Sequence, residues 1–166
     1  CSNTEHNSTI AFAAYKEIEN VNPIYSTGFD QLDKLIVGFE PGTLTLVAGR
    51  PSMGKSAISL SLALKMILRH SLPVIFFSLE MTKEQLEYRL WSLISIASDY
   101  SNCDLIPIQS DRIRRHRALS ETLADWELSN INKIVNIAST LPLYISDSRG
   151  VKVSDIAHEC RQIKIK

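Results

Sequence analysis

The sequence is poor in the features that define several special classes of protein. Its 166 residues include three cysteines, which are widely spaced and form no C-x-x-C pair, so neither a disulfide framework nor a zinc site is expected. No apolar run approaches the roughly 20 residues that a membrane-spanning helix requires. The polar start, CSNTEHNST, lacks the apolar region of a signal peptide. These absences favour a protein of a reducing compartment, with no membrane partner.

An excess of charge of either sign is also missing. The 18 Lys and Arg residues equal the 18 Asp and Glu residues in number, so the formal net charge is zero. A chain without a global basic surface offers no argument from charge for direct nucleic-acid binding. We interpret its one basic cluster, DRIRRHR at 111–117, as part of a solvated loop. Hydrophobic residues make up 45% of the chain, which suffices for an ordinary core, and the length suits one domain.

What the sequence does contain is a phosphate-binding motif. The stretch AGRPSMGKSAISLSLALK, residues 48–65, includes the pattern G-x-x-x-x-G-K-[ST]. Its glycines allow the backbone to curl so that N–H groups point at phosphate oxygens, and Lys55 reaches the β and γ phosphates. The Ser56 hydroxyl is the expected Mg²⁺ ligand. The nucleotide-binding residues predicted from this motif are Gly49, Arg50, Pro51, Ser52, Met53, Gly54, Lys55 and Ser56.

The motif stands in the structural context that it needs. Upstream, TLTLVAG at 43–49 is a short β-branched and apolar run after Pro41-Gly42, which predicts a strand. Downstream, residues 55–68 are apolar on most faces, as in a helix buried against a sheet, and the positive end of that helix adds to an anion site. A strand, a loop and a helix follow one another in the required order. We therefore favour a phosphate site over a chance Gly-Lys-Ser turn.

The rest of the chain alternates between apolar runs and helical periodicity. LPVIFFSLE at 72–80 is typical of a buried parallel strand, and LPLYISD at 141–147 of a second short strand. The stretch 99–118 has no periodicity and is predicted to be a long surface loop. The alternation implies an α/β fold with a parallel, doubly wound sheet. Helices are predicted over 10–20, 29–36, 82–97 after an N-cap at Thr82, 119–139 after an N-cap at Ser120, and from Ser154 onward.

The spacing of apolar residues also predicts which faces of these helices are buried. In the helix over 119–139, we expect Trp126, Ile134 and Ile137 to point inward. In the last helix, the residues expected on one face are Ile156, Cys160 and Ile163.

Glu80 is a lone carboxylate at the carboxyl end of a predicted strand. Ligands of open α/β sheets bind at that edge, and the phosphate-binding motif lies at the same edge. Glu80 can therefore orient and deprotonate the water that attacks the γ-phosphate. The alternative is an acid near the start of the helix over 82–97, where it stabilises the helix dipole. These residues alone leave both roles open.

Several segments together resemble a known family. STGFDQLDKL…GFEPGTLTLVAGRPSMGKS, FFSLEM, ADW and LYISDSRGVKVSDIAHECRQIK, in this order, are similar to the motor domain of bacterial-type replicative DNA helicases, the DnaB family of RecA-like ATPases. The resemblance runs from about residue 24 to the end. It implies a RecA-like P-loop NTPase fold, with a parallel sheet flanked by helices that is incomplete here. By the same resemblance ATP and Mg²⁺ are the cofactors, Lys55 and Ser56 contact phosphate and magnesium, and Glu80 is catalytic.

The resemblance also implies partners and an organisation. Residues 1–23 are a polar start with a linker-like helix that docks on a neighbouring subunit, and residues 24–166 are the amino-terminal half of the motor domain. The parent protein is expected to be a homohexamer with single-stranded DNA in its ring, and to meet primase through a collar domain absent here. It is expected in the bacterial cytoplasm, or in the plastid stroma if the gene is organelle-encoded.

Some elements of such a motor are expected outside this sequence. The DNA-binding loops, the arginine finger and the aspartate that holds magnesium through water are expected past Lys166. Asp147 is the other candidate for that aspartate, but its segment resembles the one just before the family's aspartate strand. We therefore expect the chain by itself to be inactive.

The sequence departs from the family's pattern at one position, and its residues leave two alternative functions open. Val37 stands where the family has the first glycine of a pair. A RecA-like recombination or repair ATPase is one alternative, and a non-enzymatic nucleotide-binding piece that needs a partner chain is the other. The SLEM block and the linker-like start favour the helicase.

Overall fold

The structure is a computed structural model that describes residues 23–148 and 150–165. The chain forms two compact units, one up to Val47 and one from Ala48 onward. The helix predicted over 10–20 lies outside the described residues. The expected division at residues 23 and 24 stays a prediction.

In the first unit, a short helix is anchored by its own acidic side chain. Helix α2 runs over Asp30–Ile36, which confirms the helix predicted at 29–36. The Asp33 carboxylate accepts hydrogen bonds from Ser26 Oγ and from the N–H of Thr27, both at 2.7 Å. Hydrogen bonds from Thr27 and Ser26 lower the pKa of Asp33 to about 2. The carboxylate therefore stabilises the chain entry into α2 more strongly when it is ionised than when it is protonated.

The residues after α2 form a tight backbone contact. Tyr25 and Phe39 form an isolated antiparallel bridge, with N–H to O distances of 2.9 and 2.8 Å. A Cβ on Gly38 would lie 2.6 Å from the Tyr25 carbonyl oxygen, so only glycine fits there. Val37, the cap residue, has a φ of 65°, a conformation that is strained for a β-branched residue. Val37 therefore carries a backbone strain that glycine would avoid.

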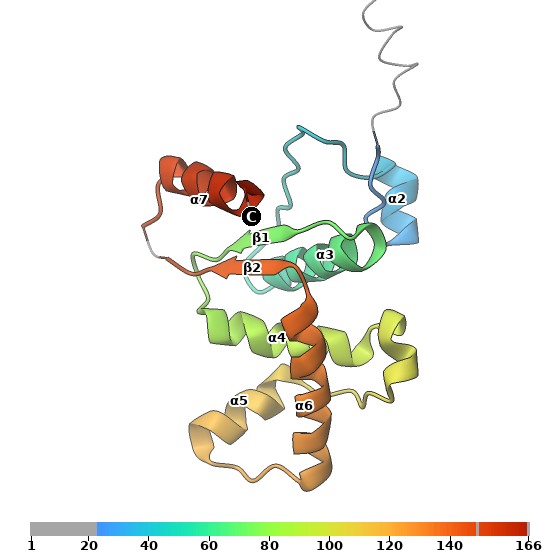
Figure 1. The fold of residues 1–166 in the computed structure, drawn as a ribbon, viewed down its shortest axis with the longest axis vertical. Helices are drawn as coiled ribbons and strands as arrows, with labels where there is room; N and C mark the ends of the chain where they lie inside the picture. The colour runs from blue at the N-terminus through green and yellow to red at the C-terminus, as the bar shows by residue number, and fades with distance from the viewer. Residues whose placement is uncertain (1–22, 149, 166) are drawn as a thin grey trace, which may run out of the picture. The chain divides into compact units, whose positions relative to one another are not determined.

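The second unit is built from helices and a two-stranded parallel sheet (Figure 1). Strands β1 and β2 pair in register from Val74 with Leu143 to Phe77 with Ser146, which confirms the parallel α/β class. Helix α3 packs on β1, and α4 packs against α3, α5 and α6. The elements are α3 Lys55–His70, β1 Val74–Phe77, α4 Lys83–Ile96, η1 Ser98–Cys103, α5 Ser110–Leu119, α6 Asp125–Thr140, β2 Leu143–Ser146 and α7 Val153–Ile165.

The core of this unit joins several helices. Thr82 caps α4 as predicted, since its side chain accepts from the N–H of Gln85. The helical periodicity predicted for α4 is confirmed by burial, because Leu90 and Ile94 join the same cluster as Leu60 and Leu64 of α3. The buried members of this cluster are Leu60, Leu64, Leu90, Ile94, Ile108, Ile113 and Ile134.

The strand predicted over 43–49 is not formed. Residues 43–50 have no regular structure and are exposed, with Leu44 95% and Leu46 86% accessible. A strand is stable only when its backbone N–H and C=O groups are paired with a neighbouring strand. Among the described residues, this segment pairs with none. The β propensity of residues 43–49 is therefore not sufficient by itself to form a strand.

The prediction of a surface loop over 99–118 was also wrong. This stretch contains η1 and the regular helix α5. Helix α5 buries a single apolar residue, Ile113, so it leaves no periodic apolar pattern. It is stabilised instead by ion pairs of Asp111 with Arg114 and Arg115, one turn along the helix, both at 2.7 Å.

The start predicted for α6, with Ser120 as its N-cap, was also wrong. Ser120 does not cap α6, because it ends α5 in a left-handed conformation with a φ of 55°. Helix α6 starts at Asp125, where the N–H of Ala124 donates to Glu127 Oε2 at 2.8 Å. Ile134 is fully buried as predicted, but Trp126 is 52% exposed.

The cap predicted for α7 was wrong as well. Helix α7 begins at Val153, so Ser154 lies inside its first turn. Asp155 reaches back to accept a hydrogen bond from the N–H of Lys152 at 3.0 Å.

Candidate functional site

The phosphate-binding motif forms a loop with two residues of positive φ. Ser52 has a φ of 63° and Gly54 a φ of 84°, and the N–H of Met53 donates to the Arg50 carbonyl at 3.3 Å. Gly54 is the N-cap residue of α3 in a left-handed conformation that glycine adopts without strain. The loop therefore turns the chain directly into the start of the helix.

The start of α3 suits an anion. The first N–H groups of a helix have no partner within it and are ordinarily bonded by a capping side chain. In α3 no side chain caps them and the first turn has no acidic residue. In α4, by contrast, the capping box and Glu84 occupy the same positions. An anion bound at the start of α3 would meet free backbone donors and the positive end of the helix dipole.

Lys55 is unfavourably placed for helix stability and well placed for a phosphate. As the first residue of α3, it adds a positive charge to the positive end of the helix. Its Nζ donates to the Arg50 carbonyl at 3.4 Å, a long bond that a stronger acceptor can replace. A Cβ on Gly49 would lie 3.4 Å from Lys55 Cγ, so the lysine stem runs close beside the loop. Ser56 follows in the same turn, and its role as a magnesium ligand stays a prediction.

The chain direction brings this loop and Glu80 to one edge of the sheet. Helix α3 packs on β1, and only residues 71–73 connect the two, so they run in opposite directions. The start of α3 therefore lies toward the carboxyl ends of β1 and β2 (Figure 1). Glu80 follows the end of β1 in a bend, and it is exposed. The catalytic role of Glu80 stays a prediction.

The alternative role of Glu80, stabilising the dipole of α4, has little support. Glu80 precedes the N-cap Thr82, and so lies outside the first turn of α4. Glu84 already occupies that turn, and the pKa of Glu84 is lowered by hydrogen bonding from Thr82 and its own backbone. Helix α4 therefore has its own capping groups without Glu80.

Asp147 lies at the carboxyl end of β2 and contacts the start of α4. Its Oδ2 accepts from the N–H of Lys83 at 3.0 Å, and its Oδ1 lies 3.4 Å from Lys83 Nζ. The backbone hydrogen bond from Lys83, followed by the lysine side chain, lowers the pKa of Asp147. Both carboxylate oxygens are thus engaged by Lys83. This contact was not predicted, because no sequence pattern links residues so far apart.

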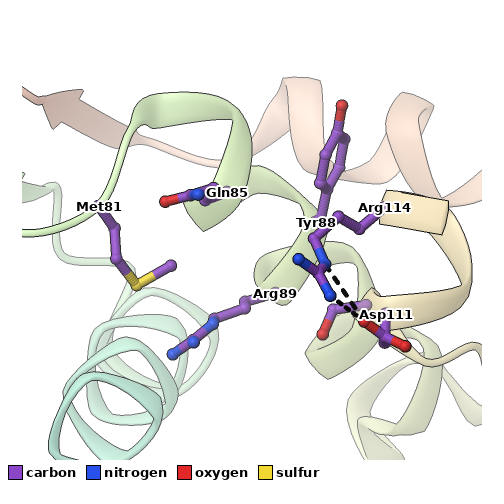
Figure 2. Close-up of a pocket in the computed structure, with 7 residues that line it drawn as sticks. Met81, Gln85, Tyr88, Arg89, Asp111 and Arg114 are labelled. Carbon is purple, nitrogen blue, oxygen red and sulfur yellow. Dashed lines mark hydrogen bonds and ion pairs between the residues drawn. The ribbon is translucent and has the colours of Figure 1, made fainter. Parts of the chain in front are cut away.

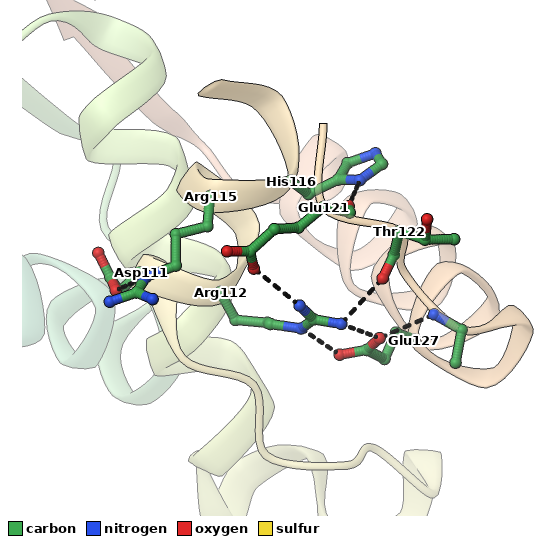
Figure 3. Close-up of polar contacts among 8 residues, drawn as sticks. Asp111, Arg112, Arg115, His116, Glu121, Thr122 and Glu127 are labelled. Atoms are coloured by element: carbon green, nitrogen blue, oxygen red, sulfur yellow. Dashed lines mark hydrogen bonds and ion pairs between the residues drawn. The ribbon is translucent and has the colours of Figure 1, made fainter. Parts of the chain in front are cut away.

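The basic cluster on α5 is largely used within the protein. The Arg112 guanidinium contacts Glu127 at 2.9 and 3.0 Å, Glu121 at 3.1 Å and the Thr122 carbonyl at 3.0 Å (Figure 3). Hydrogen bonds from Arg112 and from the N–H of Ala124 lower the pKa of Glu127 to about 2. These contacts join α5, the following loop and α6. Arg112 is therefore part of the fold, and the interpretation of 111–117 as a solvated loop was wrong, because these residues belong to helix α5.

A separate pocket of about 310 Å³ lies between α4 and α5 (Figure 2). Arg89 and Arg114 line it, but Arg114 is already paired with Asp111. None of its lining residues belongs to the phosphate-binding loop. The lining residues are Met81, Gln85, Tyr88, Arg89, Ser110, Asp111 and Arg114.

The remaining features of the described part of the chain concern metals, thiols and membranes. Within residues 23–148 and 150–165, no group of three or more His, Cys, Asp or Glu side chains could hold a metal ion. The described cysteines, Cys103 and Cys160, are free thiols. No helix among these residues is both long and apolar enough to cross a bilayer.

The chain is similar in sequence to part of several replicative helicases. The family profile of the DnaB-like helicase C terminal domain matches residues 25–166. A probable replicative DNA helicase of Trieres chinensis is 34% identical over 149 residues, which cover 90% of this chain and 29% of that protein. The replicative DNA helicase DnaB of a Nostoc species is 36% identical over 155 residues, 90% of this chain and 16% of that protein. The chain thus spans less than a third of these curated relatives.

Comparison with solved structures agrees. A solved ATPase domain matches with a TM-score of 0.69 and 25% identity, over 98% of this chain and 53% of that one. A DnaB-like replicative helicase, described together with its interactions with primase, has the same fold, with a TM-score of 0.70 at 24% identity over 99% of this chain and 36% of that one. Together with the match over residues 25–166, these findings show that the chain belongs to the DnaB-like helicase C-terminal domain family, with a RecA-like ATPase fold.

Proposed function

We propose that this chain is part of the ATP-driven motor of a replicative DNA helicase, which unwinds duplex DNA as a hexameric ring. The observation that carries the proposal is the uncapped start of α3, with its motif G-x-x-x-x-G-K-S, at the same sheet edge as Glu80. The family match over residues 25–166 supports the replicative helicase over a recombination ATPase.

In this proposal each residue of the loop has a defined task. Backbone N–H groups of the loop and of the start of α3 bind the phosphates of ATP, except at Pro51, which has no N–H, and Lys55 contacts the β and γ phosphates. The Ser56 hydroxyl would hold Mg²⁺, which would neutralise charge on the β and γ phosphates. Glu80 orients a water molecule and accepts its proton as that water attacks the γ-phosphate.

The partners are part of the same proposal. A hexamer of the parent protein would enclose single-stranded DNA, through loops mostly outside this chain, and primase would bind a separate collar domain. A structural relative is described together with its interactions with primase, which supports this assignment by similarity. A bacterial cytoplasm or a plastid stroma suits such a helicase.

Glu80→Gln tests the catalytic role. It is introduced into a motor domain completed with the remaining segment of a curated relative, so that neighbouring subunits can assemble. Nucleotide binding should persist and ATP turnover should nearly vanish, because the amide keeps the shape but does not take the proton. Turnover within about threefold of the parent, a barrier difference of only about 0.65 kcal/mol, would remove Glu80 from the mechanism.

The isolated 166-residue chain provides a second test. We expect it to bind nucleotide weakly and neither to hydrolyse ATP usefully nor to unwind DNA. Residues 43–50 lead into the loop without a strand partner in the described part of the chain, so binding must also order this segment. An arginine finger alone contributes roughly 10³–10⁵ in rate in related phosphoryl-transfer enzymes. Phosphate release is measured with and without single-stranded DNA, and robust DNA-stimulated release that Lys55→Ala abolishes would contradict the expectation.

A further inference from the structure

The carboxyl end of β2 holds both ends of the segment that carries Glu80. The N–H of Ser78 donates to the Ser146 carbonyl at 2.8 Å. At the other end, the N–H of Lys83 donates to Asp147 Oδ2 at 3.0 Å. Two consecutive residues at this end of β2 thus bind the first and last residues of the segment 78–83.

The interior of this segment is also fixed by hydrogen bonds. Ser78 is buried, and its Oγ donates to the Met81 carbonyl at 2.7 Å and accepts from the N–H of Met81 at 3.1 Å. Thr82 contributes less, because its Oγ1 lies 3.4 Å from the N–H of Gln85. The N–H of Thr82 donates to Gln85 Oε1 at 3.3 Å, so the contact from Asp147 is the shortest of the three side-chain bonds at the start of α4.

We propose that Asp147 is a positioning residue for ATP hydrolysis: by binding the first N–H of α4, it holds the backbone of residues 78–83 and thereby the Glu80 carboxylate at the nucleotide edge of the sheet. This inference rests on the proposed role of Glu80. An exposed acid in a bend has few contacts of its own, so its place depends on its backbone. A general base must lie within hydrogen-bond reach of its water, and a displacement of about 1 Å can lower the rate by roughly a hundredfold.

A magnesium ligand at Asp147 is the competing role. Both of its oxygens already contact Lys83, one through the backbone N–H and one through Nζ. Asp147→Asn separates the two roles, since the amide oxygen still accepts from the N–H of Lys83 but binds magnesium poorly. Lys83→Ala is the matched control, because it removes the ion pair and keeps the backbone bond.

The experiment uses the completed, assembled motor domain and measures kcat and KM for ATP. Asp147→Ala should lower kcat at least tenfold and change KM by less than about threefold. Asp147→Asn and Lys83→Ala should both stay within about threefold of the parent kcat. Hydrogen exchange gives a second readout: the amide of Lys83 should exchange at least tenfold faster in Asp147→Ala and stay protected in Asp147→Asn.

Each other outcome has a distinct meaning. A kcat for Asp147→Ala within threefold of the parent, or an equal loss in Asp147→Asn, would overturn the positioning role. A rise in KM without a fall in kcat would overturn it as well. Glu80→Gln is measured alongside: if that variant keeps its turnover, the proposed function of Glu80 fails. If it loses turnover while Asp147→Ala does not, only the positioning role fails.

Discussion

Replacing Lys55 by alanine tests the phosphate-binding loop most directly. The side chain lies at the start of α3, where its ammonium makes the long 3.4 Å bond to the Arg50 carbonyl. In the nucleotide complex, the ammonium would meet two phosphates. We therefore expect the substitution to reduce affinity for ATP strongly and to leave folding almost unchanged.

The size of the effect follows from the bonds gained and the freedom lost. Two charge-assisted hydrogen bonds contribute about 1.5–3 kcal/mol each. Ordering the lysine side chain costs up to about 2 kcal/mol, which leaves a net loss of about 1–4 kcal/mol. Affinity should thus fall roughly tenfold to a thousandfold. Stability should hold, because alanine is the better helix former and a positive charge at a helix start is unfavourable.

Titration calorimetry with Mg-ATP on the completed motor domain measures this change. Lys65→Ala is the control, since it removes the same side chain from the same helix outside the motif. The control should bind ATP as the parent does, and thermal unfolding should show both variants folded. An ATP affinity of Lys55→Ala within about threefold of the parent would refute the assignment of the loop.

Two further predictions concern stability. Val37→Gly should raise the free energy of unfolding by about 0.5–1 kcal/mol in urea titrations, because the relief of a positive-φ strain of about 1–2 kcal/mol exceeds the entropic disadvantage of glycine; a lower stability than that of Val37→Ala would contradict it. Because the folded pKa of Glu127 is lowered from 4.5 to about 2, its contribution is present above about pH 4.5 and is lost as the pH falls toward 2. The urea midpoint should therefore fall across that range, and it should fall less in Glu127→Gln; equal slopes would show that the Arg112 contact does not depend on ionised Glu127.

The elements with strong local signals were predicted correctly. Helices α3 and α4 and strands β1 and β2 carry periodic or continuous apolar residues, and Thr82 supplies a recognisable cap. Helix α5 was missed because it buries only Ile113 and depends on charge pairs. The strand at 43–49 was predicted wrongly because strand propensity without a pairing neighbour does not form a strand.

The candidate site also has one part that the sequence predicted and another part that it did not. The loop over 49–56 is a contiguous motif, so each of its residues could be named from the sequence. The support of the Glu80 segment by Asp147 joins residues 64 positions apart, and no local pattern encodes it. The ion pair between Arg112 and Glu127 could not be predicted from the sequence either, because it depends on how α5 and α6 pack.

The exposed segment 43–50 also offers proteases a site of cleavage. Proteases cut an extended chain that can enter their active-site cleft, and this segment is accessible along its whole length. A cut before Gly49 falls near the boundary between the two compact units and leaves the phosphate-binding loop, residues 49–56, intact on the second. If a partner segment were to pair with residues 43–49, the same peptide bonds would become resistant. The rate of cleavage at this segment would therefore report whether its strand has been formed.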